Sequence, residues 1–453
     1  MKIPGLLKKL YPFQGEGVQF VDDAEGNALI CDDMGLGKTV QGLAYLQLHP
    51  ELRPALVICI SSNKMSWEEM AIEWMKDVNI ETLWTESPYK VTGDILVINY
   101  DILQYWISYL KKKGIKAIVI DEIQNIKNTK TLRTKATRAL CNPVDNIIGL
   151  SGTPIKSKPI EFYSILSIMA PSLFPSYFYF IQRYCAAKFR FGHWDVSGSS
   201  NMRELHKKLS KIMIRRKKVD VLDDLPAKTR AVVPVSISNR AEYDSANRNF
   251  VAWVRKRKGE EAADQAKDGG AMVKNGILRR LAGAGKLKEG LKWIKAFMEG
   301  DEKLLVVCVH TKTIDSVCEA FGKAAVRMDG SVRDTRTSKK RTEAIHSFNE
   351  DPKKRIMVGQ IQVMVGMNLQ EACSNVVMLE VVQSPTDHEQ AEDRVWRMGQ
   401  EKPVTIWYII ARDTVEEDTI EKRDMKKSVI TRVVDGHHVE DEELLQEMME
   451  DVL

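Results

Sequence analysis

Residues 31–41 are Cys-Asp-Asp-Met-Gly-Leu-Gly-Lys-Thr-Val-Gln, and this stretch decides the fold. An apolar segment (27–30) precedes it, and a segment with helical periodicity (39–48) follows it. A glycine-rich loop between a strand and a helix is typical of phosphate-binding loops. Gly35 and Gly37 let the backbone wrap closely around an anion, so that N–H groups and the helix N-terminus face it. The sequence therefore predicts an α/β domain that binds a triphosphate.

The loop also supplies a cation and a hydroxyl group. We expect Lys38 to reach the β- and γ-phosphates and the Thr39 hydroxyl to bind Mg²⁺. The strict motif has glycine at the position of Asp32, and this is the departure from it here. Upstream, the amide of Gln14 offers a donor and an acceptor to an adenine. The predicted nucleotide-binding residues in this half of the chain are Gln14, Asp33, Met34, Gly35, Leu36, Gly37, Lys38 and Thr39.

Two adjacent acids follow the apolar segment 116–120. In open α/β sheets ligands bind beyond the carboxyl ends of the strands, where these acids fall. We expect Asp121 to hold Mg²⁺ through its water shell and Glu122 to orient or deprotonate the attacking water. Because they follow a phosphate-binding loop, the pair favours ATP hydrolysis over a strand that ends in solvated acids.

Short apolar runs alternate with helix-like segments at both ends of the chain, which is typical of parallel sheets covered on both faces. We expect strands at 27–30, 55–60, 94–100, 116–120, 146–150, 304–310, 355–359, 375–380 and 404–410. The middle of the chain lacks this alternation and concentrates basic residues, with a flexible loop expected at about 259–276. The predicted architecture is α/β, with parallel-sheet lobes at 1–170 and 291–435, a mainly helical basic insertion at 171–290 and an acidic tail at 436–453.

Composition and charge narrow the class of protein. The chain has 453 residues, of which 44% are apolar and 28% charged, as in ordinary soluble proteins. Its seven cysteines are scattered and never spaced C-x-x-C, which argues against zinc and favours a reducing, intracellular compartment. No apolar run approaches the ~20 residues that span a bilayer, and no secretory signal is visible. We therefore expect location in the cytoplasm or nucleoid.

The charge distribution favours a polyanionic partner. Residues 436–453 hold seven acids and no Lys or Arg, so removing these seven negative charges from the net charge of +5 leaves the rest of the chain at +12. A basic body of this kind suits nucleic acid, although basic runs are also found on solvated helix faces.

Seven motifs in order resemble those of the Swi/Snf-type branch of the superfamily-two helicase-like ATPases. They are Tyr11-Pro-Phe-Gln14, Asp33-Met-Gly-Leu-Gly-Lys-Thr39, Asp121-Glu-Ile-Gln124, Leu150-Ser-Gly-Thr-Pro154, Arg215-Arg-Lys-Lys218, Gly366-Met-Asn-Leu369 and Gln390-Ala-Glu-Asp-Arg-Val-Trp-Arg-Met-Gly-Gln400. The resemblance covers about 10–170 and 290–425. Within the branch, the fourth motif and the start of the seventh are similar to the fork-remodelling, annealing-helicase subgroup.

The resemblance implies two RecA-like lobes with ATP between them. Gln390, Arg394 and Arg397 are spaced i, i+4 and i+7, so on one helix they share a face. Family analogy makes Gln390 a nucleotide contact and presents the two arginines across the cleft, where an arginine stabilises transition-state charge. The resemblance further implies that Ser151 and Thr153 couple the nucleotide to the track. The remaining residues expected at DNA or in coupling are Arg215, Arg216, Lys217 and Asn368.

Three positions depart from the family pattern. Gln124 replaces a usual His in the acidic motif, and we expect its amide to bridge between motifs. Val363 and Met364 are bulkier than the small residues usual before Asn368. Trp396 also stands where His is usual.

We predict an ATP- and Mg²⁺-dependent translocase on double-stranded DNA that remodels DNA or protein–DNA complexes. The alternatives are a strand-separating helicase, a weakly hydrolysing ATP-bound clamp, or, less favoured, an RNA motor. With no reader domain visible, such a minimal motor suits a phage, a mobile element or a bacterium.

Overall fold

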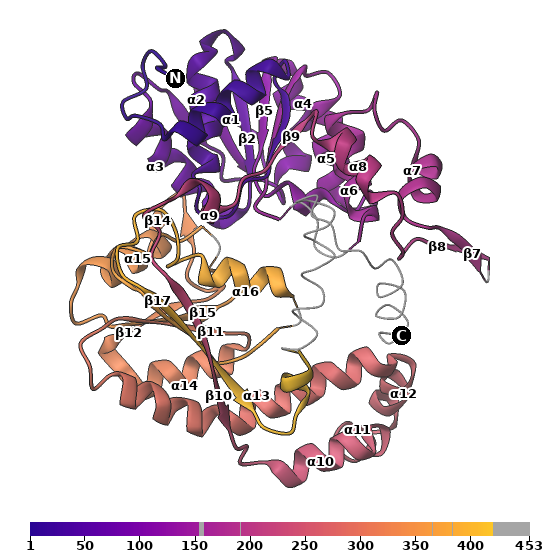
Figure 1. The fold of residues 1–453 in the computed structure, drawn as a ribbon, viewed down its shortest axis with the longest axis vertical. Coiled ribbons are helices and arrows are strands. Elements are labelled where there is room, and N and C mark those ends of the chain that lie inside the picture. The colour runs from indigo at the N-terminus through magenta and orange to yellow at the C-terminus, as the bar shows by residue number, and fades with distance from the viewer. Residues whose placement is uncertain (154–157, 191, 365, 383, 420–453) are drawn as a thin grey trace.

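The computed structural model describes residues 1–153, 158–190, 192–364, 366–382 and 384–419. They form two α/β lobes, one above the other in Figure 1. The predicted acidic tail at 436–453 lies outside the described residues, as does the end of the predicted second lobe. No helix among the described residues is long and apolar enough to cross a membrane.

The first lobe is built on a parallel sheet with strand order β3-β4-β2-β5-β6-β1-β9. Its strands are β1 (Asn27–Ile30), β2 (Ala55–Cys59), β3 (Ile80–Thr82), β4 (Ile95–Asn99), β5 (Ala117–Ile120), β6 (Asn146–Leu150) and β9 (Met213–Ile214). Side chains alternate between its faces: Leu29 enters one apolar core while Ala28 and Ile30 enter the other. Both faces are therefore buried, as near-continuous apolar strands require.

Helices cover the two faces of this sheet. One face is covered by α1 (Pro12–Asp23), α2 (Lys38–Leu48) and α3 (Lys64–Trp74). The other is covered by α4 (Leu103–Lys113), α5 (Leu132–Cys141), α6 (Ile160–Met169), α7 (Tyr177–Tyr184) and α8 (Met202–Leu209). A small antiparallel hairpin, β7 (Lys188–Arg190) and β8 (His193–Asp195), projects from this second layer (Figure 1).

The second lobe repeats the plan with strand order β10-β17-β16-β11-β15-β12, again all parallel. Its strands are β10 (Lys228–Val235), β11 (Leu304–Cys308), β12 (Ala325–Met328), β15 (Ile356–Gln360), β16 (Asn375–Met378) and β17 (Val404–Ala411). Its main helices are α13 (Gly270–Phe297) and α14 (Thr311–Phe321) on one face, with α15 (Lys340–Glu350) and α16 (Pro385–Glu392) on the other. The predicted pair of parallel-sheet lobes is confirmed.

The region between the lobes differs from the prediction in two ways. It is mainly helical, with α9 (Lys218–Val221), α10 (Arg240–Arg248), α11 (Phe250–Lys258) and α12 (Glu260–Asp268), but β9 and β10 within it each complete a sheet. The flexible loop expected at about 259–276 is wrong, because α12 and the start of α13 occupy it. Alanines favour helix there, and Ala263 and Ala266 are buried.

Candidate functional site

The glycine-rich loop after β1 has the backbone that close packing requires. Gly35 and Gly37 have φ of 88° and 72°, in the left-handed region that favours glycine. A Cβ at Gly35 would lie 2.6 Å from Cβ of Arg397, and one at Gly37 would lie 2.4 Å from Nε2 of Gln14. Gln14 is fully buried, and its Nε2 donates to the Leu36 carbonyl. The predicted loop residues, Gln14 and Arg397 are therefore brought together.

The loop leaves its donors open. Among the described residues, the backbone N–H groups of Gly35, Gly37 and Lys38 have no acceptor in the protein. The Lys38 ammonium donates to the carbonyls of Asp32 (2.6 Å) and Asp33 (3.0 Å), and no carboxylate of the described chain lies within ion-pair distance of it. Burial lowers the pKa of Lys38, against the raising effect of Glu122. Open N–H groups beside a half-buried cation fit a polyphosphate.

Asp32, the departure from the strict motif, is a buried anchor. Its carboxylate accepts from Arg216 Nε (3.0 Å) and Nη2 (2.6 Å) and from Gln41 Nε2 (2.9 Å). Arg216 also donates to the Phe13 carbonyl. The structure places Arg216 beneath the loop, where it pairs with Asp32, and its expected role at DNA or in coupling stays a prediction.

Arg215 lies beside it, donating to the carbonyls of Cys31 (2.8 Å) and Gly152 (3.2 Å) and lying 3.3 Å from the Asp33 carboxylate. Arg215 also supports the loop. The planar guanidinium groups of both arginines can donate to several fixed acceptors at once. Lys217 is half-buried in the same segment.

Asp121 follows β5 and is held by residues that the sequence motifs did not indicate. Its Oδ2 accepts from Trp67 Nε1 (3.0 Å) and Asn63 Nδ2 (3.3 Å), and its Oδ1 from the backbone of Glu122. Burial and the charge of Glu122 raise the pKa of Asp121 to about 6. A Cβ at Gly366 would lie 2.0 Å from Asn63 Oδ1, so Asn63 also touches the second lobe.

A continuous hydrogen-bonded chain runs from Glu122 to the Ser-Gly-Thr motif. Gln124 Nε2 donates to Glu122, and Gln124 Oε1 accepts from Ser151 Oγ (2.7 Å). Ser151 Oγ in turn accepts from the backbone N–H of Thr153 (3.0 Å). The hydroxyl of Thr153 is buried without a partner among the described residues. Gln124 thus bridges two motifs, and Glu122 holds a left-handed backbone (φ 49°) at the start of the chain.

The second lobe brings its arginines to the loop, but by a different local structure from the one predicted. Helix α16 ends at Glu392, so the expected shared helix face stops after Gln390. The turns beyond it are fixed by the buried carboxylates of Glu392 and Asp393, which pair with β10 and with Lys218. These ion pairs with distant residues outweigh the local helical pattern, so the helix ends at Glu392.

Arg394 and Arg397 converge nevertheless. Both donate toward the Met367 carbonyl, at 3.5 and 3.4 Å, and Arg397 also donates to the Asn368 side chain. Burial lowers the pKa of Arg397 to about 10. Burial also lowers the pKa of Arg394, and the charges of Asp393 and Glu122 offset only part of this effect. Arg397 Nε is buried without a partner among the described residues. Asn368 is exposed beside them.

Lys218, which lies in the fifth motif but was not among the predicted site residues, joins the two lobes. Its backbone N–H donates to Asp33 (3.1 Å), while its ammonium binds Asp393 (2.6 Å) and the Trp396 carbonyl (2.8 Å). Trp396 lies under this ammonium and donates from its indole N–H to Pro226 (2.8 Å). The tryptophan that departs from the family pattern therefore packs against the connection between the lobes.

Comparison with known proteins identifies this two-lobed site. The model of the SNF2-related domain matches residues 13–280, and that of the helicase conserved C-terminal domain matches residues 287–399. The chain belongs to the SNF2-related family. This is a family of helicase-like ATPases, and the two matched segments of this SNF2-family chain include the loop, the acids and the arginines described above.

Two curated relatives illustrate the similarity. The chain is 35% identical over 424 residues to the SWI/SNF-related matrix-associated actin-dependent regulator of chromatin subfamily A-like protein 1 of Xenopus laevis, covering 91% of this chain and 43% of that protein. It is 31% identical over 436 residues to the human DNA annealing helicase and endonuclease ZRANB3, covering 91% and 39%. The SNF2-family chain thus spans about two fifths of the length of these relatives.

Among solved structures, the Sulfolobus solfataricus SWI2/SNF2 ATPase core in complex with dsDNA is similar with a TM-score of 0.47 and 24% identity. The match covers 96% of this chain and 94% of that one.

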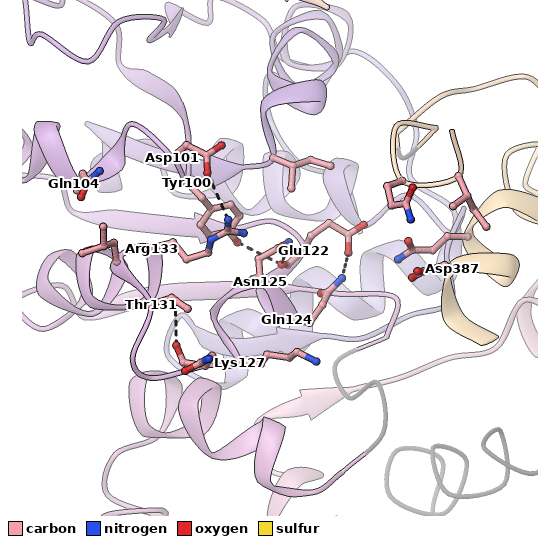
Figure 2. A pocket seen from close by; sticks show the side chains of 16 residues that line it. Tyr100, Asp101, Gln104, Glu122, Gln124, Asn125, Lys127, Thr131, Arg133 and Asp387 are labelled. Carbon is pink, nitrogen blue, oxygen red and sulfur yellow. Dashed lines mark hydrogen bonds and ion pairs between the residues drawn. The ribbon is translucent and has the colours of Figure 1, made fainter. Parts of the chain in front are cut away.

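A hollow of about 820 Å³ lies between the lobes of this SNF2-family chain (Figure 2). Glu122 and Gln124 form part of one wall, and Asp387 of the second lobe faces them. Amide and charged side chains dominate the lining, which includes Asp101, Gln104, Asn125, Lys127, Asn128, Arg133, Gln362 and Gln390. The loop residues 33–39 do not line it, so the hollow and the loop adjoin Glu122 separately. Met364, one of the two bulkier residues before Asn368, is buried in the core of the second lobe.

Proposed function

We propose that this chain hydrolyses ATP between its two lobes and uses the cycle to move along double-stranded DNA, remodelling DNA or protein–DNA complexes. The observation that carries the proposal is the loop: open N–H groups of Gly35, Gly37 and Lys38 beside an ammonium without a carboxylate partner, facing Arg397 of the other lobe. A polyphosphate supplies the anion that this arrangement lacks.

The residues present also fit the expected metal. Thr39 in the first turn of α2 and Asp121 at the end of β5 would hold Mg²⁺, which would supply positive charge to offset that of the phosphates. Glu122 would orient the attacking water and accept its proton. Arg394 and Arg397 would stabilise the charge that develops on the γ-phosphate, and closing of the lobes would bring them into place.

The chain of hydrogen bonds from Glu122 through Gln124 to Ser151 supports coupling between nucleotide and track. When the partner of Glu122 changes, Gln124 must reorient, and Ser151 and Thr153 can exchange hydrogen-bond partners. The hydroxyl of Thr153, buried without a partner among the residues that the structure describes, leaves room for that exchange.

DNA as the track is supported by the basic body of the chain and by the hollow beside Glu122. Its amide side chains can donate to phosphodiester oxygens, which are contacted without reading sequence. The human relative is named a DNA annealing helicase. We place the DNA backbone in this hollow, so that ATP and DNA would meet Glu122 and Gln124 from opposite sides.

Steady-state ATP hydrolysis tests the proposal, with the protein alone and with duplex DNA, single-stranded DNA or RNA, and with Lys38→Ala as the blank. We expect duplex DNA to stimulate turnover most. Movement is then measured by displacement of a third strand from a triplex, while a label on the duplex reports whether its own strands separate. Stimulation mainly by single strands, with separated duplex, would identify a helicase instead. Bound ATP without turnover would identify a clamp.

A further inference from the structure

The β7–β8 hairpin carries an aromatic surface that the ATP site does not use. Phe189 and Trp194 lie directly opposite each other across the two strands, with ring centroids 5.3 Å apart. Phe178 on α7 meets the other side of Trp194, also at 5.3 Å. These three residues, here called the aromatic ridge, form one contiguous surface of rings.

The ridge is exposed. Phe189 is 61% exposed, Phe178 49% and Trp194 38%, although large apolar side chains are normally buried. A contiguous exposed apolar patch on a protein marks an interaction site. A hairpin of three residue pairs is marginally stable by itself, so projecting these rings into water carries a cost that only a function offsets.

The base of the hairpin is fixed, so the ridge is a rigid projection. Ser200 Oγ and Asn201 Nδ2 both donate to the Arg183 carbonyl (2.8 and 2.7 Å), and Ala186 N–H donates to Ser200 Oγ (3.1 Å). Tyr184, fully buried, donates to Glu204 (2.7 Å). Rings on a rigid base lose little conformational entropy on binding a partner.

The charge around the ridge selects the kind of partner. Lys188 and Arg190 flank Phe189 on β7 and are exposed. Residues 177–211 contain seven Lys or Arg and two acids, an excess of +5 that equals the net charge of the whole chain. Aromatic rings bordered by cations are the combination that binds single-stranded nucleic acid, because bases stack on rings while cations contact phosphates.

The position of the ridge fits a partner that also occupies the motor. Figure 1 shows α7 and the hairpin extending from the first lobe on the same side of the molecule as α11 and α12 of the other end. Hydrogen bonds from Ser197 lower the pKa of Asp195 on β8. The charges of Arg190 and of Lys158, which follows the Ser-Gly-Thr-Pro motif, lower it by smaller amounts. The hairpin therefore lies near Lys158.

We propose that the aromatic ridge stacks unpaired bases of DNA where a duplex opens into a single strand, so that the preferred substrate is a junction rather than a plain duplex. This inference rests on the proposed function, since it takes DNA as the track. It adds a base-contacting surface outside the ATP site and the hollow between the lobes.

The test compares the full chain with two double variants on blunt and forked DNA of equal length. Phe189→Leu/Trp194→Leu keeps apolar packing across the hairpin but removes the flat rings, whereas Phe189→Tyr/Trp194→Phe retains them. Ile72→Ser, an equally exposed apolar residue on α3 at the opposite side of the molecule, is the control. Fluorescence anisotropy gives the affinities, and 5-iodouracil at the first unpaired position crosslinks any ring that touches it.

We expect the natural chain to prefer forked DNA, with crosslinks to Phe189 or Trp194. The leucine variant should lose about tenfold in fork affinity for each lost stacked base, while the aromatic variant and Ile72→Ser keep it. Stimulation of ATP hydrolysis by blunt duplex should stay unchanged in all three.

Equal fork affinity in the natural chain and the leucine variant would overturn the inference. So would light scattering that finds a dimer in the natural chain and a monomer in that variant, because the ridge would then bind a second copy. Absence of ATPase stimulation by every DNA in the natural chain would instead contradict the proposed function, which keeps the two failures distinct.

Discussion

The connections β1–α2 and β11–α14, one in each lobe, have the same form, but only the second is occupied by a carboxylate of the described chain. Each leads from a buried parallel strand into a helix whose N-terminal N–H groups attract an anion. In the first lobe the N–H groups of Gly35, Gly37 and Lys38 are left open. In the second, the chain supplies the anion itself.

That anion is the carboxylate of Glu380, which is 4% exposed. It accepts from the backbone N–H groups of Val309 (2.7 Å) and His310 (2.9 Å), from the His310 ring (2.8 Å) and from Thr313 Oγ1 (3.0 Å). Gly283 of α13 packs directly against it, since a Cβ there would lie 2.8 Å from Oε1. The site is full before any ligand arrives.

The difference teaches what makes a phosphate site out of a common fold. A strand followed by a helix is not sufficient; the chain must also keep its own carboxylates away from the N–H groups and add a half-buried lysine. Two lobes of one architecture can then divide the work, because one receives the nucleotide while the other contributes Arg394 and Arg397 from outside.

The largest expected effect comes from breaking the support under the open loop. Arg216→Met leaves the buried carboxylate of Asp32 unpaired, so we expect the free energy of unfolding of the first lobe to fall by about 3–5 kcal/mol, measured by urea denaturation. Asp32→Asn combined with Arg216→Met should recover much of the loss. If the double variant is no more stable than Arg216→Met, the pair does not hold the loop.

The next prediction compares a lysine in the first turn of each helix. Lys38→Ala should reduce ATP turnover by about 10²–10³-fold, as removal of a single group that stabilises transition-state charge does. Lys312→Ala, in the first turn of α14, should leave turnover unchanged because Glu380 already fills that site. Initial rates at saturating ATP make the comparison, and a similar loss in both variants would contradict the division between the lobes.

Opening the filled site should cost stability without creating a second nucleotide site. Glu380→Gln should lower the free energy of unfolding by about 1–3 kcal/mol at pH 7, while Glu319→Gln on the exposed face of α14 should not. ATP binding by calorimetry should remain at one per chain; two per chain would show that the carboxylate alone excludes the second nucleotide.

The same variant has a pH dependence of defined sign. Burial raises the pKa of Glu380, but hydrogen bonds from His310 and Val309 outweigh it and hold the pKa below the ordinary value. The carboxylate therefore stabilises the fold above about pH 4, the pKa of an unfolded glutamate, and loses this contribution as pH falls through the lower folded value. The difference in free energy of unfolding between the natural chain and Glu380→Gln should therefore become smaller below pH 4. A difference that stays constant down to pH 3 would show that it comes from packing and not from the charge of Glu380.

The smallest effect is expected in the hydrogen-bonded chain from Glu122 to Ser151 in the first lobe. Gln124→Leu removes the link between Glu122 and Ser151, worth about 1 kcal/mol, so the ratio of DNA-stimulated to basal turnover should fall roughly fivefold. Gln124→His, which restores the residue usual in the family, should keep the ratio. An unchanged ratio in Gln124→Leu would exclude this route of coupling.

Sequence reasoning located the parts of the site that have local patterns. The loop, the Asp121–Glu122 pair and the two arginines are recognisable because spacing and flanking strands are properties of short segments. The two lobes followed from the same alternation. The expected bridge at Gln124 also has its counterpart in the structure.

What the sequence did not give depends on distant partners. In the sequence Asp32 is a departure from the strict motif. The structure shows that it anchors the loop, because it pairs with Arg216, which is 184 residues away. Trp67 and Asn63 hold Asp121 from another strand-to-helix connection. Helix α16 ends early because ion pairs with other elements outweigh its local pattern. The available signal for the pairing of Asp32 was a charged residue in place of a glycine, together with the distant basic run at Arg215–Lys218.

Strand β9 has a consequence for how the chain comes into being. It pairs with β1, Leu29 opposite Met213, and brings Arg216 beneath the loop. At about 5–20 residues per second, those 184 residues separate the two strands by roughly 10–40 seconds of synthesis. Until then β1 remains an open edge and Asp32 lacks its counterion. The nucleotide loop is therefore completed only once the segment that leads to the second lobe has been synthesised.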